Sequence, residues 1–275
     1  MLLTVTDDFS PEKIHASGQC FHWEQTGPDA WRILHAGHCV RFRAQGDGVF
    51  SFSCGEEEFR SVWAPYLDLD EEYAAIRRRI DPRTDPFLWA AAESERGIRI
   101  LRQDFWETLV TFIISQNRNI PAIRRSVELL CALCGEARTD DSGEPYRTFP
   151  PPESVAALSN EALNSCKLGY RAAYVRAAAE AVASGRIRGE DLRSADCEEA
   201  VQTLMQIRGV GRKVASCVAL FGLHQLDAFP RDVWISRVLE EAYPDGYPFG
   251  RYSPYNGVCQ QYLFAYRRHL EAPSA

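Results

Sequence analysis

The spacing of apolar residues divides the chain into an early region with a period of two and a later region with a helical period. Segments 30–37, 38–45 and 48–55 (AWRILHAG, HCVRFRAQ and GVFSFSCG) alternate apolar and polar residues and are rich in Val, Ile, Phe and Trp. Such alternation is typical of half-buried strands. Turn residues, including the Gly-Asp-Gly sequence at 46–48, separate the segments. The first third therefore predicts antiparallel hairpins.

From about Glu71 onward, apolar residues recur at i, i+3, i+4 and i+7, which indicates amphipathic helices. Residues 135–153 are the one long polar, proline-rich stretch, and we expect a loop there. The pattern predicts an α+β fold, with an N-terminal antiparallel β-sheet domain and flanking helices over residues 1–96. A mainly helical domain is expected over 97–275. The helical segments are 104–116, 120–134, 152–166, 171–185, 197–207, 211–222, 231–243 and 258–270.

The net charge of the protein does not by itself decide whether the protein binds nucleic acid. The 275 residues carry a formal net charge of −7, which by itself counts against binding to nucleic-acid phosphates. Residues 1–100, however, hold 11 basic and 17 acidic residues, so a local basic patch can still form on the remainder. The sequence has no run of 18 apolar residues and no secretory leader pattern, so we expect an intracellular protein with no membrane segment.

The nine cysteines are odd in number and irregular in spacing, which argues against a disulfide framework. Cys131 and Cys134 form a single C-x-x-C at the end of an apolar helical pattern. One such pair without a second is a weak zinc signal, so buried core thiols are the favoured interpretation. No metal site is predicted from these residues.

The segment 204–222 (LMQIRGVGRKVASCVALFG) places Gly209 and Gly211 between two helical patterns. Such a turn brings backbone N–H groups to a helix N-terminus, where they and the helix dipole suit a DNA phosphate. A plain helix–helix turn that needs glycine explains the pattern equally well. Lys213 falls in the first turn of the second helix, where the dipole favours the neutral amine that a nucleophilic lysine needs. A surface lysine is the ordinary alternative.

Asp232 comes just before the next apolar helical pattern, so its ordinary interpretation is a helix N-cap. Together, Lys213 in GVGRKVASC and Asp232 in FPRDVW resemble the helix–hairpin–helix glycosylases, and within them 8-oxoguanine DNA glycosylase/AP lyase. The resemblance runs from Gly18 to Phe264 with its motifs in family order. These motifs are GQCFHW (18–23), GIRILRQDFWE (97–107), ISQNRNI (114–120), KLGYRAAYV (167–175) and PYNGVCQQYLF (254–264).

The resemblance implies the role of each matching residue in excision of a flipped base. Lys213 would attack the sugar and form a Schiff base, and Asp232 would support the positive charge. Four positions would bind the lesion: Gly18 through its carbonyl, Cys217 and Phe264 on the two faces of the base, and Gln260 on its Watson–Crick edge. Without the resemblance, Cys217 and Phe264 would be interpreted as core residues, because helical Cys and Phe usually are.

The resemblance also implies a set of DNA contacts. Asn117, Tyr170 and Arg171 would fill the gap left by the flipped base and bind the orphan cytosine. We expect Arg171 to project outward toward the DNA, although an ordinary solvated arginine fits the sequence as well. Gly209 and Gly211 would meet a phosphate. We also expect a basic patch that includes Arg171, Arg208 and Arg212.

The expected function is a bifunctional DNA repair glycosylase/AP lyase that removes 8-oxoguanine opposite cytosine by a Schiff base and β-elimination. The expected partner is double-stranded DNA with an oxidised purine, bound by a monomer in the cytoplasm (nucleoid) of a bacterium or the nucleus of a eukaryote. No cofactor is expected to be required; a monovalent cation at the helix–hairpin–helix is the one ion that the family suggests.

Two positions depart from the family pattern: Trp234 stands where members often have His, and Phe221 where some have Met. Both changes are expected to alter the shape of the site without touching the chemistry. Two alternatives remain open. An alkylpurine glycosylase shares the hairpin and the aspartate but has no lysine at position 213, and a hairpin module could bind DNA without catalysis.

Overall fold

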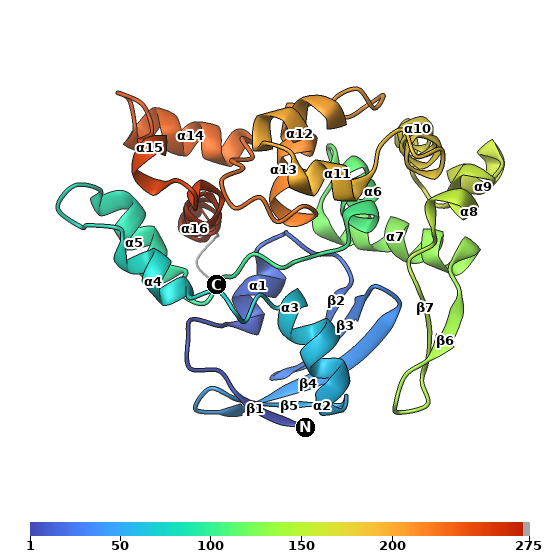
Figure 1. Cartoon of the computed structure of the whole chain (residues 1–275), viewed down its shortest axis with the longest axis horizontal. Coiled ribbons are helices and arrows are strands. Elements are labelled where there is room, and N and C mark those ends of the chain that lie inside the picture. The colour runs from blue at the N-terminus through green and yellow to red at the C-terminus, as the bar shows by residue number, and fades with distance from the viewer. Residues whose placement is uncertain (272–275) are drawn as a thin grey trace.

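The computed structural model describes residues 1–271, and its first part is a five-stranded antiparallel sheet. The strand order is β1-β5-β4-β3-β2, and the predicted hairpin segments form β3, β4 and β5. In Figure 1 the sheet lies at the bottom of the molecule, beside the N-terminus. The strands are β1 (Leu2–Thr4), β2 (Trp23–Gly27), β3 (Ala30–His35), β4 (His38–Gly46) and β5 (Val49–Phe52).

One face of the sheet carries the large side chains of a separate hydrophobic core. Trp31 pairs with Phe42 across β3 and β4, and both are almost fully buried. A run of short helical turns covers this core, and its apolar residues lie one turn apart. The helical period therefore begins at Glu56, earlier in the chain than the predicted change from strand to helix near Glu71. The run consists of α2 (Glu56–Glu58), η1 (Phe59–Trp63) and α3 (Ala64–Tyr66).

The rest of the chain is mainly helical, as predicted, and forms a layer over the sheet (Figure 1). Helix α6 (Phe105–Ser115) lies at its centre and buries nine of its residues against neighbouring helices. The other helices are α1 (Pro11–Ala16), α4 (Tyr73–Arg78), α5 (Pro86–Ser94), α7 (Ile120–Cys134), α8 (Pro152–Ala156), α9 (Asn160–Ser165), α10 (Arg171–Ala183), α11 (Gly189–Ser194), α12 (Cys197–Leu204), α13 (Arg212–Phe221), α14 (Val233–Ala242), α15 (Phe249–Tyr252) and α16 (Asn256–Glu271).

The stretch 135–153 is more ordered than the predicted loop, because it contains a second antiparallel hairpin. Strands β6 (Ala137–Thr139) and β7 (Pro145–Arg147) pair with each other at the side of the molecule (Figure 1). The Tyr146 hydroxyl and Arg138 Nη1 each donate a 2.9 Å hydrogen bond to the Gly37 carbonyl. These contacts dock the hairpin on the turn between β3 and β4.

The two hydrophobic cores divide the chain differently from the predicted boundary at 96/97. Residues of α4 and α5, such as Tyr73 and Leu88, pack in the larger helical core, whereas Leu101 packs with the sheet. The connection 96–103 therefore runs between the cores, and the boundary stays a prediction. Within residues 1–271, all nine cysteines are free thiols, and no helix is long and apolar enough to cross a membrane.

Candidate active site

The turn between α12 and α13 contains two glycines that differ in what surrounds them. Gly209 has φ +85, and a Cβ atom there would lie 2.1 Å from the Tyr174 ring. Gly211 has φ −92 and is the N-cap of α13, and a Cβ there would meet nothing within 4 Å. Packing within the protein therefore explains why residue 209 is a glycine, but it does not explain the glycine at position 211. The bare N-cap leaves the first N–H groups of α13 without a side-chain acceptor and open to an anion.

Lys213 is the second residue of α13, as predicted, and its side chain is exposed. The Nζ atom lies 5.5 Å from the centroid of the Phe112 ring, which stacks on Phe221 at 5.5 Å with an interplanar angle of 12°. Cys217 follows one turn later and is buried. Burial raises the pKa of the Cys217 thiol, and the nearby Lys213 ammonium partly opposes this. The two side chains therefore share one face of α13.

Asp232 caps helix α14, which confirms the local interpretation of this residue. Its Oδ1 accepts a 2.9 Å hydrogen bond from the Ile235 amide. Among the described residues, no donor bonds Oδ2, so one carboxylate oxygen stays available. Asp232 also raises the pKa of the Cys217 thiol, which places the carboxylate near the Lys213–Cys217 face. No ion pair within 4.0 Å joins Asp232 to Lys213 in residues 1–271.

Gly18 has a backbone conformation that its neighbour Gln19 holds in place. The φ of Gly18 is +75, and a Cβ would meet nothing within 4 Å. The Gln19 side chain is fully buried; it donates to the Arg99 carbonyl and accepts from the Leu101 amide, both at 2.9 Å. Gln103 Nε2 donates to the Gln19 carbonyl at 2.8 Å. Sequence reasoning missed Gln19, although it lies inside the GQCFHW motif.

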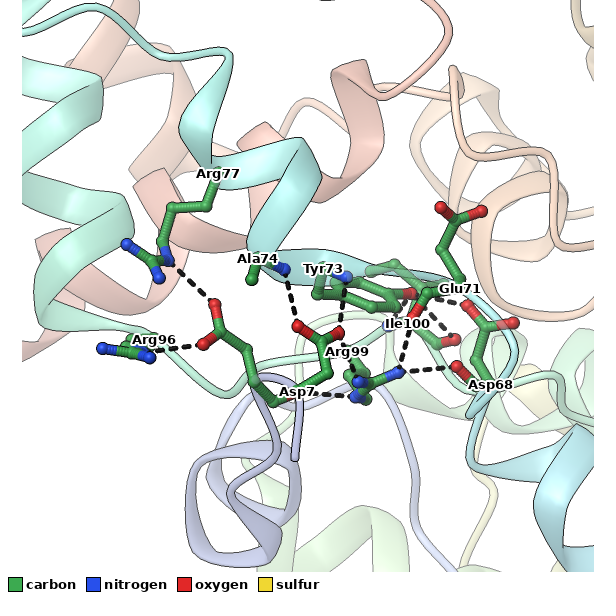
Figure 2. A network of polar contacts seen from close by, with 10 residues as sticks. Asp7, Asp68, Glu71, Tyr73, Ala74, Arg77, Arg96, Arg99 and Ile100 are labelled. Carbon is green, nitrogen blue, oxygen red and sulfur yellow. Dashed lines mark hydrogen bonds and ion pairs between the residues drawn. The ribbon is translucent and has the colours of Figure 1, made fainter. Parts of the chain in front are cut away.

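Arg99, whose carbonyl Gln19 binds, is itself the centre of a buried polar network (Figure 2). Its guanidinium is inaccessible to solvent and donates to the carbonyls of Asp8 (2.6 Å) and Asp68 (2.7 Å) and to the Asp7 carboxylate (2.6 Å). It also lies 4.7 Å from the Tyr73 ring centroid. Removing one partner of a buried ion pair costs about 3–5 kcal/mol, so this network fixes the segment that supports Gly18.

The two predicted lesion-binding residues of α16 have partners of their own in this structure. Gln260 is buried, and its Nε2 donates to the Pro230 carbonyl at 3.0 Å while its Oε1 accepts from Gln261 at 3.0 Å. Pro230 lies two residues before Asp232, so Gln260 also braces the loop that carries the carboxylate. Phe264 is half-buried, and the Arg268 guanidinium lies 5.4 Å from its ring centroid.

Asn117 and Tyr170 come together on the surface, in agreement with the predicted grouping. Asn117 is exposed with φ +51, and its Nδ2 donates to the Tyr170 hydroxyl at 3.3 Å. Tyr170 is 52% exposed despite its size, and it packs edge-on against Tyr174. A second link joins this group to the hairpin, since Gln116 Nε2 donates to the Gly209 carbonyl at 3.1 Å. Sequence reasoning missed Gln116.

The prediction that Arg171 projects outward is wrong in this structure. The residue is only 6% exposed. Its Nε and Nη2 both donate to the Gln116 carbonyl, the former at 2.8 Å, and Nη1 donates to the Leu168 carbonyl at 3.3 Å. The guanidinium also stacks on the Tyr170 ring at 4.3 Å. Arg171 lies inward because the turn at 116–117 presents carbonyls that need donors.

The predicted basic patch is weaker than the sequence suggested. Arg171 is buried, and Arg212 makes a bidentate ion pair with Glu198 at 2.6 and 2.9 Å. This pairing lowers the pKa of Glu198 to about 2, so both charges persist at neutral pH. Arg208 remains exposed beside the turn. Trp234, at the family's His position, is half-buried with the Arg237 guanidinium 5.5 Å from its ring.

The monovalent cation that the resemblance suggests at the helix–hairpin–helix stays a prediction. In the 205–211 turn, the Ile207 carbonyl accepts from the Val210 amide, and the Gly209 carbonyl accepts from Gln116. Within residues 1–271, no group of three His, Cys, Asp or Glu side chains could hold a metal ion.

Comparison with known proteins places this geometry in a family. Residues 1–109 match the model of the 8-oxoguanine DNA glycosylase N-terminal domain, and residues 110–245 match the HhH-GPD superfamily of base excision DNA repair proteins. The N-glycosylase/DNA lyase of Saccharomyces cerevisiae is 37% identical over 217 residues, which cover 74% of this chain. They cover 55% of that relative, so the chain spans about half its length.

Two solved structures are similar over nearly the whole chain. MBOgg1 in complex with a low-affinity DNA ligand is 35% identical, with a TM-score of 0.91 and coverage of 98% of this chain and 95% of that one. The Clostridium acetobutylicum 8-oxoguanine glycosylase/lyase, bound to double-stranded DNA with cytosine opposite 8-oxoG, is 30% identical, with a TM-score of 0.88 and 98% coverage of both chains. The chain therefore belongs to the 8-oxoguanine DNA glycosylase family of the HhH-GPD base excision repair superfamily.

Proposed function

We propose that this chain excises 8-oxoguanine paired with cytosine in double-stranded DNA and then cleaves the strand at the resulting site. The observation that carries the proposal is the exposed amine of Lys213 at the N-terminus of α13, on one face with the Cys217 thiol and near the Asp232 carboxylate. An alkylpurine glycosylase needs no amine at this position. A module that only binds DNA needs neither the amine nor the free carboxylate oxygen.

The chemistry proceeds in two steps on the flipped nucleotide. The Lys213 amine attacks C1′, the C1′–N9 bond breaks, and its electron pair leaves with the base. The free Oδ2 of Asp232 stabilises the positive charge that develops on the sugar. The nitrogen then loses one proton, its lone pair forms the C=N bond while the C1′–O4′ bond breaks, and O4′ takes up a proton. The resulting iminium at C1′ makes the C2′ proton acidic. Removal of that proton expels the 3′ phosphate by β-elimination.

Recognition of the lesion rests on groups held rigidly before DNA arrives. 8-Oxoguanine carries a proton on N7 where guanine has a lone pair, so the Gly18 carbonyl would accept a bond from the lesion alone. Leaving such a buried polar group unpaired costs about 1–3 kcal/mol. Gln19 and the Arg99 network fix the position of that carbonyl. Cys217 and Phe264 would stack on the base.

The DNA would dock on the open N-terminus of α13 and on the Asn117–Tyr170 surface. Gly211 lets a phosphate approach the first amides of the helix. Asn117 and the exposed Tyr170 ring would fill the gap and face the orphan cytosine, with Arg171 supporting them from behind. A single copy of the chain supplies all of these groups, so a monomer suffices for the reaction.

Borohydride trapping tests the proposal, because the sequence contains only three lysines, Lys13, Lys167 and Lys213. We expect the wild-type protein to form a covalent adduct with a duplex that carries 8-oxoguanine opposite cytosine. Lys213→Gln should form no adduct and release no base while still binding DNA. Lys167→Gln, which removes another exposed amine, is the matched control and should keep the adduct.

Each alternative gives a different result in the same assay. Base release without an adduct would indicate a glycosylase that uses water, with Asp232 as its only catalyst. Binding without base release would indicate a DNA-binding module. Base release by Lys213→Gln at the wild-type rate would refute the Schiff-base mechanism.

A further inference from the structure

Three side chains from distant parts of the sequence meet in a second polar cluster that the proposed chemistry does not use. His22 follows the Gly18 turn, Glu107 lies in the first turn of α6, and Cys131 lies in the last turn of α7. The Nδ1 atom of His22 is 2.7 Å from Glu107 Oε1, and its Nε2 is 3.5 Å from the Cys131 sulfur. A thiol, an imidazole and a carboxylate thus stand in line. This is the order that activates a cysteine nucleophile.

The imidazole is held in its charged form by this arrangement. Burial by itself disfavours a charge on His22, but the Glu107 carboxylate and the contact with Cys131 together outweigh burial and raise the pKa of His22 well above its ordinary value. A cation on one side of a thiol stabilises the thiolate, which is the reactive form. Cys131 is 4% exposed, so solvent screens this pairing little.

A cavity of about 420 Å³ gives small molecules access to the pair. Its volume lies in the range of sites for small ligands. His22 and Cys131 line it together with three aromatic rings and three guanidinium groups, from Phe21, Trp23, Tyr146, Arg32, Arg124 and Arg147. In residues 1–271, no carboxylate lies within 4.0 Å of the Arg124 guanidinium, and its Nε is buried without a hydrogen-bond partner. Two carboxylates, from Glu24 and Glu128, also line the cavity, but the three guanidiniums outnumber them. The cavity therefore favours an anion that has an aromatic or apolar part.

We propose that Cys131 is a reactive cysteine, activated by His22 and Glu107, and that the adjoining cavity admits small anionic disulfides that modify it. The site is separate from the lesion-binding residues, because none of Lys213, Cys217, Asp232 or Phe264 lines this cavity. The two motifs that form it are GQCFHW and the C-x-x-C of α7. The second of these has no role in base excision.

The modification is a thiol–disulfide exchange. The Cys131 thiolate attacks one sulfur of the reagent, a new S–S bond forms, and the old S–S bond breaks. The second half of the reagent leaves as a thiolate with the electron pair. His22 keeps its proton and its ion pair with Glu107. The Cys131 sulfur is oxidised to the disulfide state, one reagent sulfur is reduced to a thiolate, and no further oxidant is needed.

Cys134 is the internal reference for this reaction. It lies one turn further along the same helix and is more exposed than Cys131. Burial and the neighbouring thiols raise the pKa of Cys134 to about 11, so it is almost entirely protonated at neutral pH. Exposure alone therefore predicts that Cys134 reacts first, whereas the proposed activation predicts that Cys131 does.

The test is labelling of the native, full-length protein with 5,5′-dithiobis(2-nitrobenzoate), an anionic aromatic disulfide, followed by peptide mass spectrometry. At about pH 6.5, we expect Cys131 to react at least about tenfold faster than Cys134. Peptide mapping separates both signals from Cys217.

Other titratable and charged groups surround the pair. Glu107 contacts His22 directly, and Glu24, Glu128, Arg32, Arg124, Arg147 and Tyr146 line the cavity. Burial raises the pKa of the Tyr146 phenol and lowers the pKa of His35 to about 4. Burial also lowers the pKa of His15, which contacts Arg124. The phenol and these two imidazoles are therefore uncharged at neutral pH.

Two variants separate activation from access. His22→Asn should slow labelling of Cys131 at least about tenfold. Arg124→Gln should slow the anionic reagent but leave alkylation by neutral iodoacetamide unchanged. If Cys131 of the wild-type protein reacts no faster than Cys134 at about pH 6.5, the proposal is wrong, whether or not the variants fold.

Discussion

Replacement of each glycine in the 209–211 turn by alanine separates the two roles that this turn can have. Gly209 adopts φ +85 and faces the Tyr174 ring, whereas Gly211 adopts φ −92 and faces open space. A structural turn needs the first glycine. A phosphate site at the N-terminus of α13 needs the second, because an added methyl group would stand where the phosphate approaches the helix amides.

The structure sets the size of each effect. At Gly209, an L-residue in the left-handed region costs about 1–2 kcal/mol. The clash of its Cβ with the ring, 2.1 Å away, adds about 1–3 kcal/mol of overpacking. Gly209→Ala should therefore lower the free energy of unfolding by about 2–5 kcal/mol. At Gly211 only the N-cap changes, from Gly to a poorer capping residue, at about 0.5–1 kcal/mol.

Urea unfolding and fluorescence anisotropy with a duplex that carries 8-oxoguanine measure the two effects separately. Gly211→Ala should unfold near the wild-type urea concentration but bind DNA at least about tenfold more weakly, a loss of about 1.4 kcal/mol. Gly209→Ala should unfold at a lower urea concentration than the wild-type protein, and its DNA binding should fall only in proportion to the fraction of folded protein. Wild-type DNA affinity of Gly211→Ala would refute the phosphate site and leave the turn a purely structural element.

Three further predictions test the surrounding site. Asp232→Asn keeps a capping side chain, so we expect the melting temperature to change little while single-turnover excision falls at least about a hundredfold. A lowered melting temperature with unchanged excision would mean that Asp232 is only a helix cap. Arg171→Ala should lower the melting temperature by unpairing buried carbonyls, worth about 1–3 kcal/mol, and slow excision alike opposite all four bases; a changed ratio among four matched duplexes would instead indicate a base contact. Burial opposes ionisation of Asp8, but ion pairs with Arg77 and Arg96 lower its pKa, so these pairs stabilise the fold above about pH 4 and are lost as the pH falls through the lowered value. Asp8→Asn should therefore flatten the fall in melting temperature below about pH 4, and an unchanged slope would contradict this assignment.

Interactions between near neighbours in the chain were predictable. The alternation in residues 30–55 predicts three strands of the sheet, and the helical period predicts the helices that carry the site. The cap at Asp232 and the place of Lys213 in the first turn of α13 follow from the same short-range patterns. A cap bonds an amide three residues away, so its partners are visible in the local sequence.

Contacts between distant segments were not predictable, because the local sequence pattern does not indicate which distant residue will be the partner. The hairpin in 135–153 consists of two strands of three residues each, and its docking depends on Gly37, about a hundred positions earlier. Arg171 turns inward to bind the Gln116 carbonyl, 55 positions away. Its sequence context alone fits an outward arginine equally well.

Period, caps and turns were enough to predict three strands of the sheet, the helices around the 209–211 turn and the positions of Lys213 and Asp232 in them. The catalytic roles proposed for these two residues came from the family resemblance of the sequence. Which side chains stay free to react depends on the packed molecule. It leaves Gly211 and one Asp232 oxygen open and encloses Arg171. It also brings His22 and Cys131 together across 109 positions. Burial and the pairing of polar groups are properties of the packed molecule, and they arise when the helices close over the sheet.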